Sequence, residues 1–166
     1  CRQNILIEWP ESGREIHIPT PAITFQKELT LDLGGLTARI FLVDSDHSPD
    51  CCEVQLVEEG VVFLGDCLYL NMDHEPWFRT PERTRRLMSV LTALNAGWYV
   101  PAHHGVYSGE EFRRFAREMS DLCQAAEGAE TLEQAEDSLR RLTGRALCEE
   151  DRQGLEEFLN AKAHRA

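Results

Sequence analysis

Residues 44–70 read DSDHSPDCCEVQLVEEGVVFLGDCLYL, and this stretch decides the fold. It divides into a polar loop, a strand, a turn and a second, apolar strand, over residues 44–52, 53–57, 58–60 and 61–64. The apolar strand ends at Gly65-Asp66, and a hairpin that turns at Glu59-Gly60 places Asp66 opposite about Glu53. That position is the sheet edge where the loop carrying His47 enters. The sequence therefore predicts that His47 and Asp66 share one rim of the sheet.

A third polar side chain is expected at the same rim. A predicted helix over residues 81–94 crosses to another apolar strand, residues 98–100, which is followed by Pro101-Ala102-His103-His104-Gly105. A crossover of this length suits a parallel neighbour, whose end lies beside the end of the preceding strand. Catalytic groups of α/β sheets collect at the carboxyl ends of strands. We therefore expect His103 to lie beside Asp66.

Three motifs in this order, H-S-P-D, F-L-G-D-C and P-A-H-H-G, carry a resemblance to a known family. Over residues 29–112 the chain resembles the C-terminal half of a metallo-β-lactamase-fold hydrolase. The resemblance implies an α/β fold, namely the C-terminal half of an αββα sandwich with a mixed sheet, helices and a C-terminal helical segment. It also implies metal ligands: His47 on one metal, Asp66 bridging two metals, and His103 on the second. The implied cofactor is one or two Zn ions, with Fe or Mn as alternatives.

The family's first motif, H-x-H-x-D-H, is absent, since His17 is the only histidine before residue 47. A catalytic zinc ion usually has three protein ligands and a water, whereas the matched residues supply two ligands to each metal. We therefore expect the chain alone to bind Zn weakly or not at all and to show no hydrolysis. An upstream segment, a second chain or a substitute ligand would change this. The substitutes that the chain offers are Cys52, Cys67, His74 and His104.

The resemblance implies a metal-dependent hydrolase in which metal-activated water attacks an ester-, thioester- or lactam-like bond of a small molecule, with Asp66 as the catalytic residue. The loop after this residue carries His74, Trp77 and Phe78, which are candidates for substrate contact because loops at this edge shape the pocket in that family. One alternative is a metal-poor, catalytically incomplete binding or assembly module of the same fold. Another is an unrelated α+β domain with an acidic helical surface.

Several residue assignments have alternatives. Asp66 could instead end its strand by accepting backbone hydrogen bonds, as aspartates often do at turns. His104 could be the ligand in place of His103. For Cys52 and Cys67, burial as small apolar residues is the simpler interpretation, because cysteine is among the most buried residue types.

Composition limits the classes of partner. The 166 residues are 42% hydrophobic and 28% charged, which suits one domain with a sizeable core. The net charge of −12, from 29 acidic against 17 basic residues, disfavours a nucleic-acid partner. No apolar run is long enough for a membrane span. Six cysteines without a signal peptide favour free thiols and a cytoplasmic location. The chain begins at Cys1, which with the missing motif favours a piece of a longer protein.

The rest of the chain supplies further strands and helices. Short strands are expected at residues 4–9 and 15–18, and a hairpin at residues 29–33 and 38–43 around Gly34-Gly35. Helix-start signals at Ser108 and Thr131 precede two more helices, and a further helix is expected at residues 149–163. We divide the chain into a partial sheet-and-helix region, 1–124, and a helical extension of the same domain, 125–166. The extension is a layer on the sheet or a docking surface for another subunit, such as a second copy.

Overall fold

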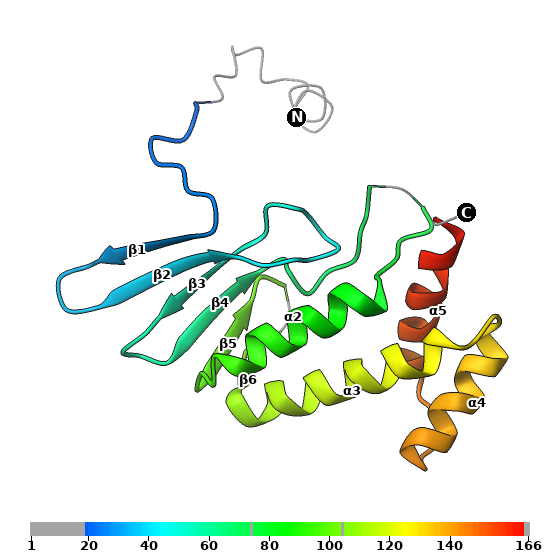
Figure 1. The fold of residues 1–166 in the computed structure, drawn as a ribbon. Helices are drawn as coiled ribbons and strands as arrows, with labels where there is room; N and C mark the ends of the chain where they lie inside the picture. The colour runs from blue at the N-terminus through cyan, green and yellow to red at the C-terminus, as the bar shows by residue number, and fades with distance from the viewer. Residues whose placement is uncertain (1–18, 74, 104, 165–166) are drawn as a thin grey trace, which may run out of the picture.

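The computed structural model describes residues 19–73, 75–103 and 105–164, which form a mixed six-stranded sheet and four helices (Figure 1). The elements are β1 Glu28–Asp32, β2 Thr37–Leu42, β3 Cys52–Leu56, β4 Val61–Gly65, α2 Pro81–Ala93, β5 Trp98–Pro101, β6 Tyr107–Ser108, α3 Gly109–Glu127, α4 Leu132–Thr143 and α5 Glu149–Ala163. Strands β1 to β4 form an antiparallel meander, β5 pairs with β4 in parallel through the α2 crossover, and β6 pairs antiparallel with β5. The predicted α/β class, the hairpins and the parallel crossover are confirmed.

The register of the β3–β4 hairpin differs from the prediction. Val54 pairs with Phe63, whereas a turn at Glu59-Gly60 would have paired Phe63 with Leu56. The turn lies earlier because the Gly60 N–H donates to the Val57 carbonyl at 3.3 Å, and Gly60, at a φ of +60°, closes the turn. The shift is by an even number of residues, so every side chain keeps its predicted face.

The hydrophobic core lies between one face of the sheet and helices α2 and α3 (Figure 1). Phe41 and Leu64 of the sheet join Leu91 of α2 in this core, and the ring of Tyr99 stacks on Phe112 of α3 with centroids 3.9 Å apart. The Tyr99 hydroxyl donates to the Leu91 carbonyl at 3.0 Å, which satisfies the buried oxygen. This packing fixes the direction of α2, and so the positions of the strands that it connects.

The opposite face of the sheet is apolar and partly exposed. Phe63 of β4 is 42% exposed and Trp98 of β5 is 51% exposed, and they share this face with half-buried Ile40 and Val54. Alternation along each strand assigns these residues to the face away from the helices. Large apolar side chains gathered on one open face indicate a surface that another layer covers.

The C-terminal helices pack on α3 rather than on the sheet. Leu122 of α3 shares the core with Leu139 of α4 and Leu155 of α5. Residue 125 lies inside α3, so the extension begins as the last turn of that helix. None of the helices that the structure describes is long and apolar enough to cross a membrane. The strands predicted at residues 4–9 and 15–18 lie outside the described residues.

Candidate metal centre

The structure brings His47, Asp66 and His103 together at the edge of the sheet where β4 and β5 end. Asp66 directly follows β4, His103 follows β5, and His47 lies in the loop between β2 and β3. The His47 Nε2 atom is 4.0 Å from Asp66 Oδ2, and the His103 Nε2 atom is 3.5 Å from Asp66 Oδ1. The two imidazoles therefore face different oxygens of one carboxylate.

Local backbone geometry directs Asp66 to this rim. Gly65 has a φ of +47°, a left-handed conformation that costs a residue with a side chain about 1–2 kcal/mol. The strand therefore turns sharply at this glycine. The Ala102 N–H donates to the Gly65 carbonyl at 3.0 Å, which joins the end of β5 to the end of β4. This bond holds the segment carrying His103 beside Asp66.

The His47 ring is oriented by a hydrogen bond on its other nitrogen. Its Nδ1 atom is 3.1 Å from the Leu70 carbonyl oxygen, and a carbonyl can only accept, so Nδ1 carries the proton. In the neutral ring, Nε2 is then left with a free lone pair facing Asp66. Histidines that bind metals usually show this arrangement, with one nitrogen held by a carbonyl and the other directed at the ion.

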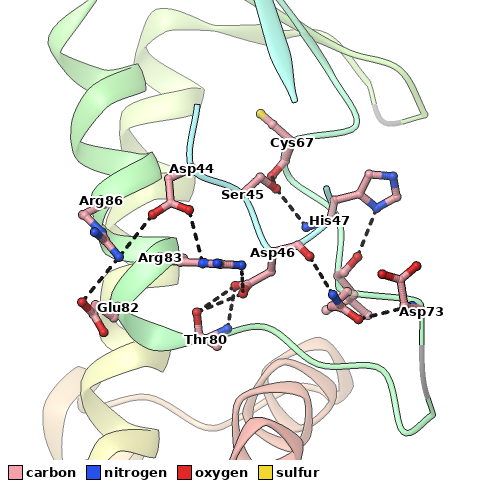
Figure 2. Close-up of polar contacts among 12 residues, drawn as sticks. Asp44, Ser45, Asp46, His47, Cys67, Asp73, Thr80, Glu82, Arg83 and Arg86 are labelled. Atoms are coloured by element: carbon pink, nitrogen blue, oxygen red, sulfur yellow. Dashed lines mark hydrogen bonds and ion pairs between the residues drawn. The ribbon is translucent and has the colours of Figure 1, made fainter. Parts of the chain in front are cut away.

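A network of side chains holds the His47 loop against α2 and the β4 turn (Figure 2). The Asp46 carboxylate is 6% exposed and accepts hydrogen bonds from the Thr80 backbone N–H at 2.7 Å and the Thr80 hydroxyl at 3.0 Å. Thr80 is the N-cap of α2, so a negative charge sits at the positive end of this helix. On the other side, the Ser45 hydroxyl donates to the Cys67 carbonyl at 2.8 Å and accepts from the His47 N–H at 3.1 Å. The loop is thereby fixed at both ends.

Sequence reasoning missed Tyr69, which is near both histidines. Its ring centroid is 5.9 Å from that of His47 and 5.4 Å from that of His103, with an edge-on contact to the second ring. It also missed the role of Asp46. The acidic residue next to a candidate ligand was a signal, but its partner Thr80 is 34 residues away.

The donor set suits divalent metals. Imidazole nitrogen and carboxylate oxygen bind Zn at about 2.0–2.2 Å, so two donors of one ion lie about 3–4 Å apart, as the two observed spacings do. Asp66 Oδ1 is inaccessible to solvent and has no hydrogen-bond partner among the described residues, which fits an oxygen reserved for a cation. Among the residues that the structure describes, no group of three or more His, Cys, Asp or Glu side chains could hold a metal ion. The described residues thus supply a partial donor set.

The other residues named from the sequence are placed differently. Cys67 is 2% exposed, and burial together with Glu53 raises the pKa of its thiol far above the ordinary range, which keeps it protonated. The expected burial is wrong for Cys52, which is exposed and whose thiol donates to the Asp50 carbonyl. Phe78 stacks on His164 of the C-terminal region with centroids 4.4 Å apart. Trp77 lines a hollow with residues of α5. His17, His74 and His104 lie outside the described residues.

Glu53 is an ionisable residue on a predicted strand, and its burial was not predicted from the sequence. It is 0% exposed, on the helix-covered face of β3, and its carboxylate oxygens accept no regular hydrogen bond from the part of the chain that the structure describes. Burial raises its pKa to about 8, and the neighbouring Cys67 thiol offsets only part of that rise. Glu53 is therefore largely neutral at pH 7.

No protein-family model and no curated protein sequence matches the chain, but solved structures do. The sec-alkylsulfatase Pisa1 from Pseudomonas sp. is 12% identical, with a TM-score of 0.56 over 86% of this chain and 26% of that chain. A double mutant of this sulfatase is 11% identical, with a TM-score of 0.57 over 89% and 27%. A metallo-beta-lactamase family protein from Thermus thermophilus is 18% identical, with a TM-score of 0.48 over 97% of this chain and 58% of that chain.

The chain shares its fold with the sec-alkylsulfatase structures. The six-stranded mixed sheet and the helices of the described residues match the α/β architecture predicted from the sequence. At this level of identity the similarity shows the fold alone. The chain spans 58% of the Thermus protein and 26% of the sulfatase, so each of these solved structures contains a large region that this chain does not.

Proposed function

We propose that the chain forms the C-terminal half of a metal-dependent hydrolase of the metallo-β-lactamase superfamily. The observation that supports this most directly is the arrangement at the rim, where the two oxygens of Asp66 face the Nε2 atoms of His47 and His103. One carboxylate between two imidazoles is the arrangement needed to bridge two cations about 3.5–4 Å apart. The Oδ1 atom of Asp66 is inaccessible to solvent and accepts no hydrogen bond from the described residues, which supports the same interpretation.

In this proposal His47 and Asp66 would hold one cation, and His103 and Asp66 would hold the other. A bound Zn ion would supply a water that loses its proton near pH 7 and attacks an ester-, thioester- or lactam-like bond. The chain's own contribution is positional: the Leu70 carbonyl orients the His47 ring through Nδ1 so that Nε2 faces Asp66, and Asp46 with Ser45 holds the loop. The net charge of −12 favours a small-molecule substrate over nucleic acid.

The open face of the sheet supports a second half. In a two-sheet sandwich the inner face of each sheet is apolar and covered by the other sheet. Phe63 and Trp98 lie on such a face, at 42% and 51% exposure. We propose that an upstream segment or another chain covers this face and supplies the donors that are missing from each cation position.

The test is metal content and turnover, measured on the 166-residue chain and on a longer protein that joins this chain to the segment proposed to complete the site. After dialysis we expect the longer protein to retain metal, and to cleave at least one substrate in a panel of esters, thioesters and lactams with sensitivity to chelator. The chain alone is expected to do neither. Retained Zn and turnover in the chain alone would show that it completes its own site. Their absence from both proteins would rule out the hydrolase.

The second candidate is a metal-poor binding or assembly module of the same fold. It is favoured by one observation, namely that no group of three or more metal-binding side chains in the described ranges could hold an ion. The same experiment separates the two candidates, because a module of this kind stays free of metal and inactive in the longer protein as well.

A further inference from the structure

A groove on the helical layer is distinct from the candidate metal centre. It lies between α2 and α3, which run side by side over the sheet (Figure 1), and it has a volume of about 560 Å³. Met88 and Ala93 of α2 and Ala116 of α3 form its apolar parts, and Ser89 and Ser120 add hydroxyl groups. The small side chains of Ser89, Ala93, Ala116 and Ser120 leave room for the backbone of another segment to approach closely.

The groove is positively charged in a strongly acidic chain. Arg85 of α2 and Arg113 and Arg117 of α3 line it, although acidic residues exceed basic ones by 12 in the whole chain. Arg85 pairs with Glu127, whereas Arg113 and Arg117 are exposed and form no ion pair with any residue of the described ranges. Two unpaired arginines one turn apart repel each other mildly. Within the part of the chain that the structure describes, Arg113 and Arg117 remain without an ion pair although the chain has many carboxylates, which suits the binding of an anionic group from outside the chain.

We propose that this groove docks a short acidic amphipathic helix. Lining residues from Thr84 to Ala93 extend for about 14 Å along α2, the length of a helix of about nine residues at 1.5 Å per residue. Acidic residues four positions apart on such a helix match the one-turn spacing of Arg113 and Arg117. Apolar residues beside them would contact Met88 and Ala116. The contact is small, so the affinity is that of a transient complex.

The test uses a fluorescein-labelled, 15-residue alanine-rich helical peptide with two glutamates four positions apart and leucines on the same face. Binding to the full chain is measured by fluorescence anisotropy at low salt. We expect the double variant Arg113→Glu, Arg117→Glu to weaken binding at least about tenfold. The matched variant Arg114→Glu, Arg141→Glu makes the same charge change outside the groove and should change the Kd less than about twofold. Circular dichroism establishes that both variants fold.

Each other outcome overturns the proposal. Equal losses in the two double variants would mean that the peptide responds only to overall charge. Undetectable binding to the wild-type chain, or equal binding of a peptide with lysines in place of glutamates, would mean that the groove does not select acidic helices. Wild-type dimers in sedimentation that the Arg113→Glu, Arg117→Glu variant abolishes would assign the groove to a second copy of the chain.

Discussion

Replacing Glu53 with Gln should change how the stability of the protein depends on pH. Glu53 is fully buried on the helix-covered face of β3, and its carboxylate has no regular hydrogen-bond partner among the described residues. An ionised carboxylate in such a place is costly, so the folded state keeps the proton. Gln has nearly the same shape and no charge at any pH. The substitution therefore isolates the cost of ionisation from the cost of burying a polar group.

The sign and size follow from the two pKa values. The carboxyl group ionises near pH 4.5 in the unfolded chain, whereas burial raises its pKa to about 8 in the folded protein. Between these values the unfolded state gives up the proton and the folded state keeps it, so stability falls as pH rises. At about 1.4 kcal/mol per pH unit, the loss reaches about 3 kcal/mol at pH 7 and levels off above pH 8.

The assay is urea unfolding of wild type and Glu53→Gln at one-unit steps from pH 5 to pH 9. The free energy of unfolding of the variant should rise relative to wild type by about 1.4 kcal/mol per unit between pH 5 and pH 8. Glu58→Gln is the control, because hydrogen bonds from Thr37 lower the pKa of the exposed Glu58 carboxyl and confine its effect to acid pH. A difference between Glu53→Gln and wild type that stays flat from pH 5 to pH 8 would refute the reasoning.

Two further substitutions test the supports of the rim. Asp46→Ala removes charge-assisted hydrogen bonds to Thr80 and should lower the free energy of unfolding by about 2–3 kcal/mol in urea. Asp44→Ala breaks only exposed ion pairs and should cost less than about 1 kcal/mol, so equal losses would contradict the anchoring role. Gly65→Ala should cost about 1–2 kcal/mol, because a methyl group there meets no atom closer than 3.8 Å and only the left-handed backbone is strained. Gly128→Ala, at a φ of −90°, is the control and should leave stability unchanged or slightly raised.

Local signals predicted most of the fold because each acts within a few residues. The side chain of Ser108 accepts from the Glu111 N–H, and the side chain of Thr131 accepts from the Gln134 N–H, as their spacing indicated. Gly34-Gly35 separates β1 from β2. The shared position of Asp66 and His103 follows from the same patterns, because a parallel crossover brings the ends of β4 and β5 to one edge of the sheet.

What could not be predicted depends on contacts between distant segments. The register of the β3–β4 hairpin depends on which residues close the Val57–Gly60 turn. The predicted and observed registers place the same side chains on each face, so the alternation of apolar residues does not distinguish them. Asp46 reaches Thr80 only after α2 has docked. Glu53 occupies a strand position that is buried by the helices, although glutamate is almost never fully buried without a partner. The sequence pattern therefore did not indicate that the Glu53 side chain is buried.

The central claim, that His47, Asp66 and His103 form half of a metal site, is tested most directly by nuclear magnetic resonance. The ring signals of the histidines would be followed while Co²⁺ is added to the 166-residue chain, for wild type and for Asp66→Asn. An amide keeps the shape of the side chain but loses the charge that a cation needs. The account predicts that the His47 and His103 signals broaden together at lower Co²⁺ than that of His164, and that Asp66→Asn abolishes this preference without unfolding the protein. Broadening that begins at His164, or that is unchanged in Asp66→Asn, would contradict it.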